Sequence, residues 1–160
     1  MIRAALVLGV GNPDRGDDGV GPAVAQAVLA VGLPGVRVVA DAEPLHLLDD
    51  DVVEDVVVVV DAARSGRPPG TVQVLDALES VPPRTGSGST HTVGIDLAVD
   101  LLGALGRLPG RLALVAVEGE CFDAGAALSS AVRAAVPAAA EAIVGELGPV
   151  LDAWADGGGR

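Results

Sequence analysis

The hydrophobic positions of this chain form short apolar runs that alternate with stretches of helical spacing. The first run, Arg3–Val10, has strand length and leads into Gly9-Val10-Gly11-Asn12-Pro13, which is turn chemistry. Apolar residues then recur at near-helical spacing, at Val24, Val28, Leu29 and Val31. The pattern predicts a strand, then the loop Gly9–Gly21, then a helix.

Later segments repeat this alternation. Runs typical of strands are Val36–Ala40, Val56–Val60, Thr71–Leu75 and Leu112–Val117. Because Val56–Val60 does not alternate with polar residues, we expect a central strand that is buried on both faces and stops at Asp61. Helical or turn segments are expected at Leu45–Leu48, from His91 to Leu105, and at Ala124–Leu147, where Pro137 kinks or divides the helix.

Strands that alternate with helices predict an α/β fold, a three-layer α/β/α sandwich with a mostly parallel, twisted sheet of about five strands. The length of 160 residues fits one domain. We expect residues 1–155 to form this single α/β domain and the Gly-rich residues 156–160 to form a flexible tail.

Composition excludes several classes of function. The net charge of −12 repels phosphate backbones, and one Trp, one Phe and no Tyr leave little for base stacking, so we expect no nucleic-acid partner. The absence of Lys excludes Schiff-base chemistry and P-loop lysines. The apolar stretch at Val52–Val60 is interrupted by Glu54 and Asp55, so we expect no membrane association and a cytoplasmic location. The lone Cys121 fits a reducing compartment.

Polar candidates gather where strands of the predicted sheet end. The first loop carries Asp14, Asp17 and Asp18, the valine run ends on Asp61, and His91 precedes a predicted helix. In open α/β sheets, ligands bind beyond the carboxyl ends of the strands. Two carboxylates and an imidazole there form a plausible ligand set for Zn, Ni, Mn or Fe, with positions left open for substrate or water.

Other interpretations of the same residues stay open. Each Asp can simply cap a turn, and His91 can be a helix cap. The sequence Gly9-Val10-Gly11 also resembles part of a dinucleotide fingerprint, which suggests a nucleotide-binding module. However, Asp14 occupies the position of the third Gly, and the acidic loop places negative charge where a pyrophosphate would bind.

The loop from Gly9 to Gly21, GVGNPDRGDDGVG, resembles the opening signature of the hydrogenase maturation proteases. These endopeptidases trim the C-terminal extension from the large subunit of nickel-iron hydrogenases. The resemblance continues at Val57–Ala62, a hydrophobic strand with Asp61, and at Ser89-Thr90-His91, a Ser-x-His segment before a helix.

The resemblance implies that Asp18, Asp61 and His91 contact the nickel already installed in a hydrogenase large-subunit precursor. Asp18 stands where the family often has the longer Glu. The resemblance further implies a small, monomeric enzyme with no permanent cofactor, because the nickel is supplied by the substrate. A non-catalytic metal- or partner-binding domain of the same fold remains the alternative.

Two further groups are candidates for the chemistry. A free carboxylate such as Asp17 is a candidate general base for activating water. Cys121 with His91 suggests a nucleophile pair, although we favour simple packing for Cys121. We also expect Glu118 and Glu120 to border the crevice, or to be solvated, and His46 to lie at the surface.

Overall fold

The computed structural model describes residues 4–79 and 94–157. In chain order the elements are β1 (Ala5–Val10), the 3-10 helix η1 (Gly16–Gly19), α1 (Val20–Val31), β2 (Val36–Ala42), the 3-10 helix η2 (Pro44–Leu48), β3 (Val56–Ala63), β4 (Val72–Asp76), α2 (Ile95–Ala104), β5 (Arg111–Glu118) and α3 (Ser130–Asp156).

The strands form one sheet of five in the order β2-β1-β3-β5-β4. The pairs β1–β2, β1–β3 and β3–β5 are parallel, and β4 lies antiparallel to β5 at the edge. The predicted α/β fold with a mostly parallel sheet of about five strands is therefore confirmed.

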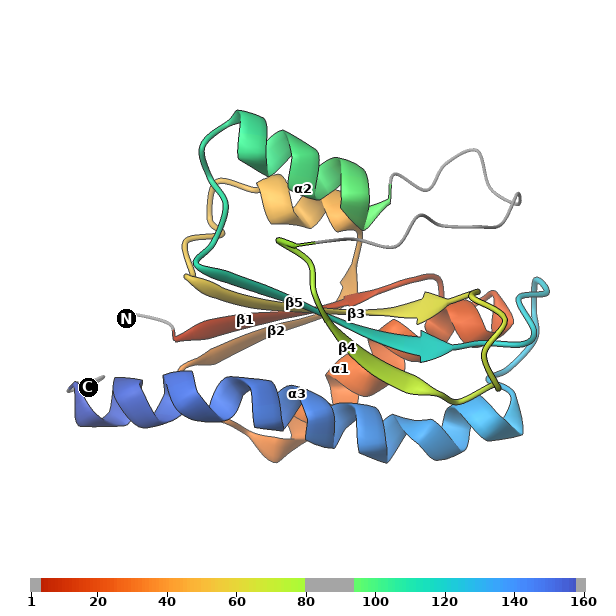
Figure 1. Cartoon of the computed structure of the whole chain (residues 1–160). Helices are drawn as coiled ribbons and strands as arrows, with labels where there is room; N and C mark the ends of the chain where they lie inside the picture. The colour runs from red at the N-terminus through yellow and green to blue at the C-terminus, as the bar shows by residue number, and fades with distance from the viewer. Residues whose placement is uncertain (1–3, 80–93, 158–160) are drawn as a thin grey trace.

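Helices cover both faces of the sheet, with α1 and α3 on one side and α2 with η2 on the other (Figure 1). The strands divide their side chains between two cores. Val58 and Val60 pack toward α1 and α3, whereas Val57 and Val59 pack toward α2. This is the expected consequence of side chains that alternate across a sheet covered on both faces, and it confirms the prediction for the valine run.

The prediction that β3 stops at Asp61 is wrong. Pairing with β5 continues to Ala63, which lies opposite Glu118. Asp61 therefore sits inside the strand, where ladder hydrogen bonds on either side fix its backbone.

The helix α3 also differs from the prediction of Ala124–Leu147. It begins at Ser130, because the preceding residues form a loop held against the first loop, and it runs unbroken to Asp156 with Pro137 inside it. Pro137 and Arg133, four residues earlier, are not buried, so water can replace the hydrogen bond that the proline removes.

The helix α3 is long and apolar enough to cross a membrane, whereas the interrupted stretch Val52–Val60 predicted no membrane association. Core helices of soluble domains, which are mostly buried, meet the same criterion, whereas 17% of the apolar window of α3 is buried inside the structure. In the structure, Val132, Ala139, Ile143 and Leu147 on α3 are fully buried in the core beneath the sheet.

Two glycines bring β1 and α1 into close contact. A Cβ at Gly21 would overlap the carbonyl oxygens of Val10 and Val60, and a Cβ at Gly9 would lie 2.7 Å from the Cβ of Ala25. The glycines of the first loop therefore serve tight helix-strand packing at the end of the sheet.

Gly21→Ala is expected to lower the free energy of unfolding by about 3 kcal/mol, because the added methyl meets backbone that cannot move aside. Gly145→Ala is the matched control. Its Cβ would meet nothing within 4 Å in the middle of α3, so it is expected to raise stability by about 0.5–1 kcal/mol. Urea denaturation of both variants measures the difference, and equal effects would contradict the packing argument.

Candidate active site

The site lies where the strand order reverses. The chain passes from β1 through α1 to β2, which pairs with one side of β1. The next strand, β3, pairs with the other side of β1, and β5 pairs with β3. In open α/β sheets, loops diverge at such a point and leave a crevice beyond the carboxyl ends of the strands. The loop carrying Asp18 and the end of β3 carrying Asp61 both belong to this edge, and η1 contacts β3.

Asp18 lies in η1 and is half-buried. Its Oδ2 accepts a hydrogen bond of 2.8 Å from the backbone N–H of Asn12, across the turn. Gly11 makes this turn with φ of +133°, a conformation that suits glycine, and a Cβ there would overlap the carbonyl oxygen of Asp18. The turn therefore orients the Asp18 carboxylate.

Asp61 is only 5% exposed. It has the same parity along β3 as Val57 and Val59, so its side chain is directed to the face of the sheet that α2 covers. Its Oδ1 accepts a hydrogen bond of 2.8 Å from the backbone N–H of Ala62. Asp18 and Asp61 thus bring two carboxylates to one edge of the sheet.

His91, the third predicted ligand, lies outside the described residues. Within the parts of the chain that the structure describes, no three His, Cys, Asp or Glu side chains form a group that could hold a metal ion. The described site therefore offers two carboxylates from the predicted ligand set.

Asp17 has a different role from the one predicted. Its side chain is fully buried, and both oxygens accept hydrogen bonds. The donors are Ser129 N at 2.7 Å, Ser129 Oγ at 2.9 Å, Glu120 N at 2.9 Å and Cys121 N at 3.0 Å. The expectation of a free carboxylate is wrong, because Asp17 is buried and both of its oxygens accept hydrogen bonds, which stabilise the charged form and disfavour the uptake of a proton.

Instead, Asp17 joins the first loop to the loop between β5 and α3. Backbone hydrogen bonds from Asp17 N to Cys121 O and from Gly16 N to Ala126 O support the same contact. Two loops far apart in sequence thus form one unit beside Asp18.

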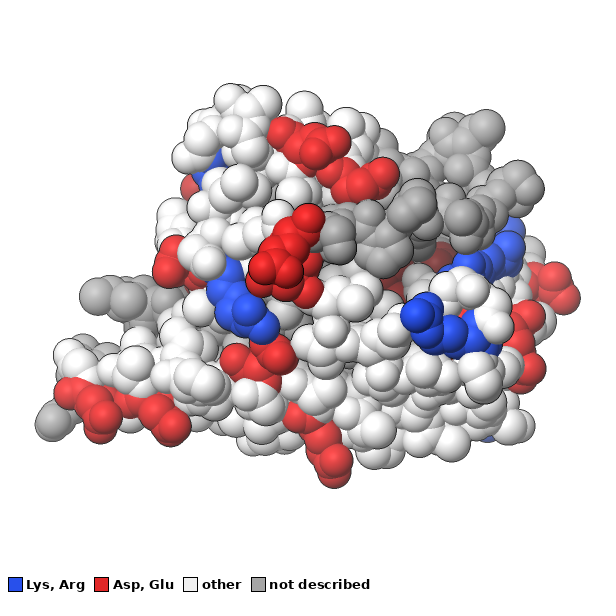
Figure 2. All heavy atoms as spheres, viewed as in Figure 1, with Lys and Arg blue, Asp and Glu red and all other residues white. Residues whose placement is uncertain are grey.

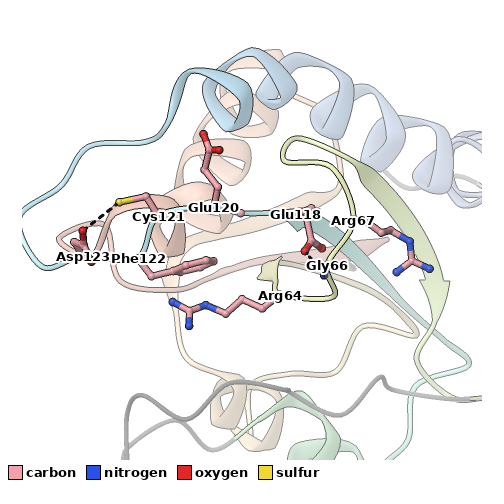
Figure 3. A pocket seen from close by; sticks show the side chains of 9 residues that line it. Arg64, Gly66, Arg67, Glu118, Glu120, Cys121, Phe122 and Asp123 are labelled. Atoms are coloured by element: carbon pink, nitrogen blue, oxygen red, sulfur yellow. Dashed lines mark hydrogen bonds between the residues drawn. The ribbon is translucent and has the colours of Figure 1, made fainter.

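A cavity of about 480 Å³ opens between the segment that follows β3 and the segment that follows β5 (Figure 3). Arg64, Gly66 and Arg67 line it on the β3 side, and residues 119–123 line it on the β5 side. Glu118 lies at its base, only 3% exposed, and its carboxylate accepts hydrogen bonds from Ser65 N, Ser65 Oγ and Gly66 N at 2.7–2.9 Å.

A sequence model of the hydrogenase maturation proteases matches residues 38–146, more than half of the chain. The chain belongs to the hydrogenase maturation protease family. The matched range includes β3 with Asp61 and begins after the loop that carries Asp18.

Among individual relatives, the chain is 31% identical over 142 residues to the hydrogenase expression/formation protein HupD of Thiocapsa roseopersicina. The match covers 85% of this chain and 64% of HupD. The chain therefore spans just under two thirds of the length of this curated relative.

Solved structures show the same fold. The hydrogenase maturating endopeptidase HybD from E. coli is 28% identical, with a TM-score of 0.75 and coverage of 89% of this chain and 91% of HybD. Another structure of an endopeptidase from Escherichia coli is 30% identical, with a TM-score of 0.77 and coverage of 89% and 91%.

In this member of the hydrogenase maturation protease family, residues between β5 and α3 also belong to the site. Ser129 precedes the true start of α3, a position typical of a helix cap, but the predicted start at Ala124 hid it. Glu118 and Glu120 were expected either to border the crevice or to be solvated; both line the cavity, Glu118 buried and Glu120 exposed. Cys121 is half-buried at the cavity, with Sγ 3.6 Å from Oδ2 of Asp123.

His46, expected at the surface, is half-buried and caps η2. Its Nδ1 lies 2.7 Å from the backbone N of Glu43, so the imidazole completes a capping box with Glu43.

Two buried carboxylates, Asp17 and Glu54, are expected to make this protein less stable at acidic pH. Burial raises the pKa of Asp17, but the backbone N–H groups of Glu120, Ser129 and Cys121 outweigh it and hold the pKa below the usual 3.8. At the other end of the sheet, burial raises the pKa of Glu54, and the Arg37 guanidinium at 3.0 Å reverses this and holds it below 4.5.

Because both pKa values are lower in the folded state, the stability they provide is present above the unfolded values and is lost as pH falls through the folded ones. We expect the free energy of unfolding to be constant above about pH 5 and to fall steadily below it. Asp17→Asn is expected to flatten that slope. Urea denaturation at a series of pH values measures the change, and an unaltered slope would contradict the role assigned to Asp17.

Proposed function

We propose that this chain is an endopeptidase that removes the C-terminal extension of a nickel-iron hydrogenase large-subunit precursor and recognises the nickel already inserted in that substrate. The observation that carries the proposal is the placement of Asp18 and Asp61 at one switch-point edge, in a chain that belongs to the hydrogenase maturation protease family. HybD and the second E. coli relative are described as endopeptidases.

In this proposal the two carboxylates, with His91, contact the nickel of the precursor and so hold the peptide bond to be cut at the edge of the sheet. The installed metal is thus required to position the peptide bond for cleavage, so an empty precursor is not cut even when its extension binds. Since Asp17 is buried, activation of the attacking water falls to the substrate's nickel or to a carboxylate beside it.

The protein itself is proposed to act as a cytoplasmic monomer that carries no metal between reactions. Nickel then arrives and leaves with the hydrogenase subunit. Metal analysis of the purified chain is expected to find no bound nickel. After dialysis against a chelator and removal of the chelator, the protein is expected to cleave the nickel-loaded precursor at its full rate.

The decisive experiment compares a nickel-loaded cognate precursor with the same precursor prepared without nickel. Mass spectrometry should detect a released C-terminal peptide only from the loaded form. Binding without release would favour the alternative, a non-catalytic metal- or partner-binding domain of this fold. Equal release from both forms would disprove the recognition of nickel.

A further inference from the structure

The cavity of about 480 Å³ lies next to the proposed catalytic edge. Arg64 follows Asp61 by three residues, and β3 and β5, whose following segments form the two walls, are neighbours in the sheet. A segment of three residues spans at most about 10 Å, so a peptide bond held at Asp61 lies within a few residues' reach of the cavity.

Buried carboxylates hold both walls in place. Glu118 fixes Ser65 and Gly66 on the β3 side, and Asp17 fixes Glu120 and Cys121 on the β5 side. The cavity is therefore preformed, which lowers the entropic cost of binding a flexible ligand.

The lining suits a peptide main chain. The guanidinium of Arg64 stacks on the ring of Phe122, 3.8 Å from its centroid, and makes a flat surface between the two walls (Figure 3). Arg67 on the β3 side carries N–H donors, and Glu120 on the β5 side carries a carboxylate acceptor. Figure 3 shows both side chains directed away from the stacked pair of Arg64 and Phe122. An extended peptide carries both carbonyl acceptors and N–H donors.

Arg67 brings a positive charge to the cavity of an acidic protein. Acidic side chains outnumber basic ones on the face shown in Figure 2. Arg37, Arg107 and Arg111 each pair with a carboxylate, whereas Arg67, within the described residues, donates a hydrogen bond of 3.0 Å to the hydroxyl of Ser65.

We propose that this cavity is the subsite that binds roughly two or three residues of the precursor's C-terminal extension in extended form. The inference rests on the proposed function. The volume accommodates a short peptide segment, and the extension is the part of the precursor that the proposed function brings to this edge. Phe122 and Arg67 then determine affinity for the precursor and leave the chemical step to Asp18 and Asp61.

The test measures binding and cleavage separately. The dissociation constant of the nickel-free precursor is measured by calorimetry, because that form is not expected to be cleaved, and KM and kcat are measured on the nickel-loaded form. Phe122→Ala and Arg67→Ala are each expected to raise the dissociation constant and KM about tenfold, with kcat within about twofold of the original.

Matched controls lie at the opposite end of the sheet. Trp154→Ala removes the other large aromatic residue, which contacts Gly35 just before β2, and Arg111→Ala removes a guanidinium from the start of β5. Both controls are expected to leave the dissociation constant and KM unchanged.

A second set of binding measurements identifies which part of the precursor occupies the cavity. With a precursor whose extension has been deleted, the original protein and Phe122→Ala are expected to bind equally, because this precursor lacks the residues that Phe122 would touch. Unchanged affinity of Phe122→Ala and Arg67→Ala for the complete precursor would overturn the proposal. A tenfold weakening of binding by Phe122→Ala that persists with the precursor lacking its extension would also overturn it. Tight binding through the cavity without cleavage of the nickel-loaded precursor would instead overturn the proposed function alone.

Discussion

Asp18→Asn is expected to slow release of the C-terminal peptide at least about a hundredfold, because a neutral amide is a much weaker metal ligand than a carboxylate. The amide oxygen can still accept the hydrogen bond from Asn12 N, so the turn is retained. Stability is expected to stay within about 1 kcal/mol, since Asp18 is half-buried. Cleavage of a nickel-loaded precursor, followed by mass spectrometry, measures the rate.

Two other substitutions separate charge from position. Asp18→Glu keeps the carboxylate and only lengthens its reach, and is expected to retain at least about a tenth of the activity. Asp14→Asn removes an exposed carboxylate from the same loop and is expected to leave the rate unchanged. If Asp18→Asn cleaves as fast as Asp14→Asn, Asp18 does not contact the reacting metal.

Asp17→Ala is expected to lower the free energy of unfolding by about 4 kcal/mol. The change removes the acceptor of four part-buried hydrogen bonds whose donors belong to Glu120, Cys121 and Ser129, and each donor left without an acceptor costs about 1–3 kcal/mol when it is shielded from water. Water admitted to the space recovers part of the sum. The loss is a large share of the stability of a domain this size.

Urea denaturation measures this effect, with Asp152→Ala on the exposed side of α3 as the control, expected within about 0.5 kcal/mol of the original. Ser129→Ala removes one of the four hydrogen bonds and is expected to cost about 1 kcal/mol. The double variant should lose less than the sum, because both changes remove the same hydrogen bond. Additive losses would show that Asp17 and Ser129 act independently.

Periodicity was sufficient to predict the layers of this fold because it is a local property. The valine run predicted a strand buried on both faces, and the alternation of Val57 and Val59 with Val58 and Val60 between two cores confirms it. The ends of elements were less predictable. β3 continues past Asp61 because β5 pairs with it, and α3 starts late because the preceding loop binds the first loop.

The sequence by itself determined the α/β fold, the strand that carries Asp61 and the loop that carries Asp18, since these follow from hydrophobic spacing and glycine placement. Only the tertiary structure distinguished Asp17 from Asp18. The two carboxylates are adjacent in the chain, but Asp17 points inward to N–H groups more than a hundred residues away, whereas Asp18 stays half-exposed at the sheet edge. No local pattern encodes those distant donors, because their position depends on how β5 pairs with β3 and how α3 packs against α1.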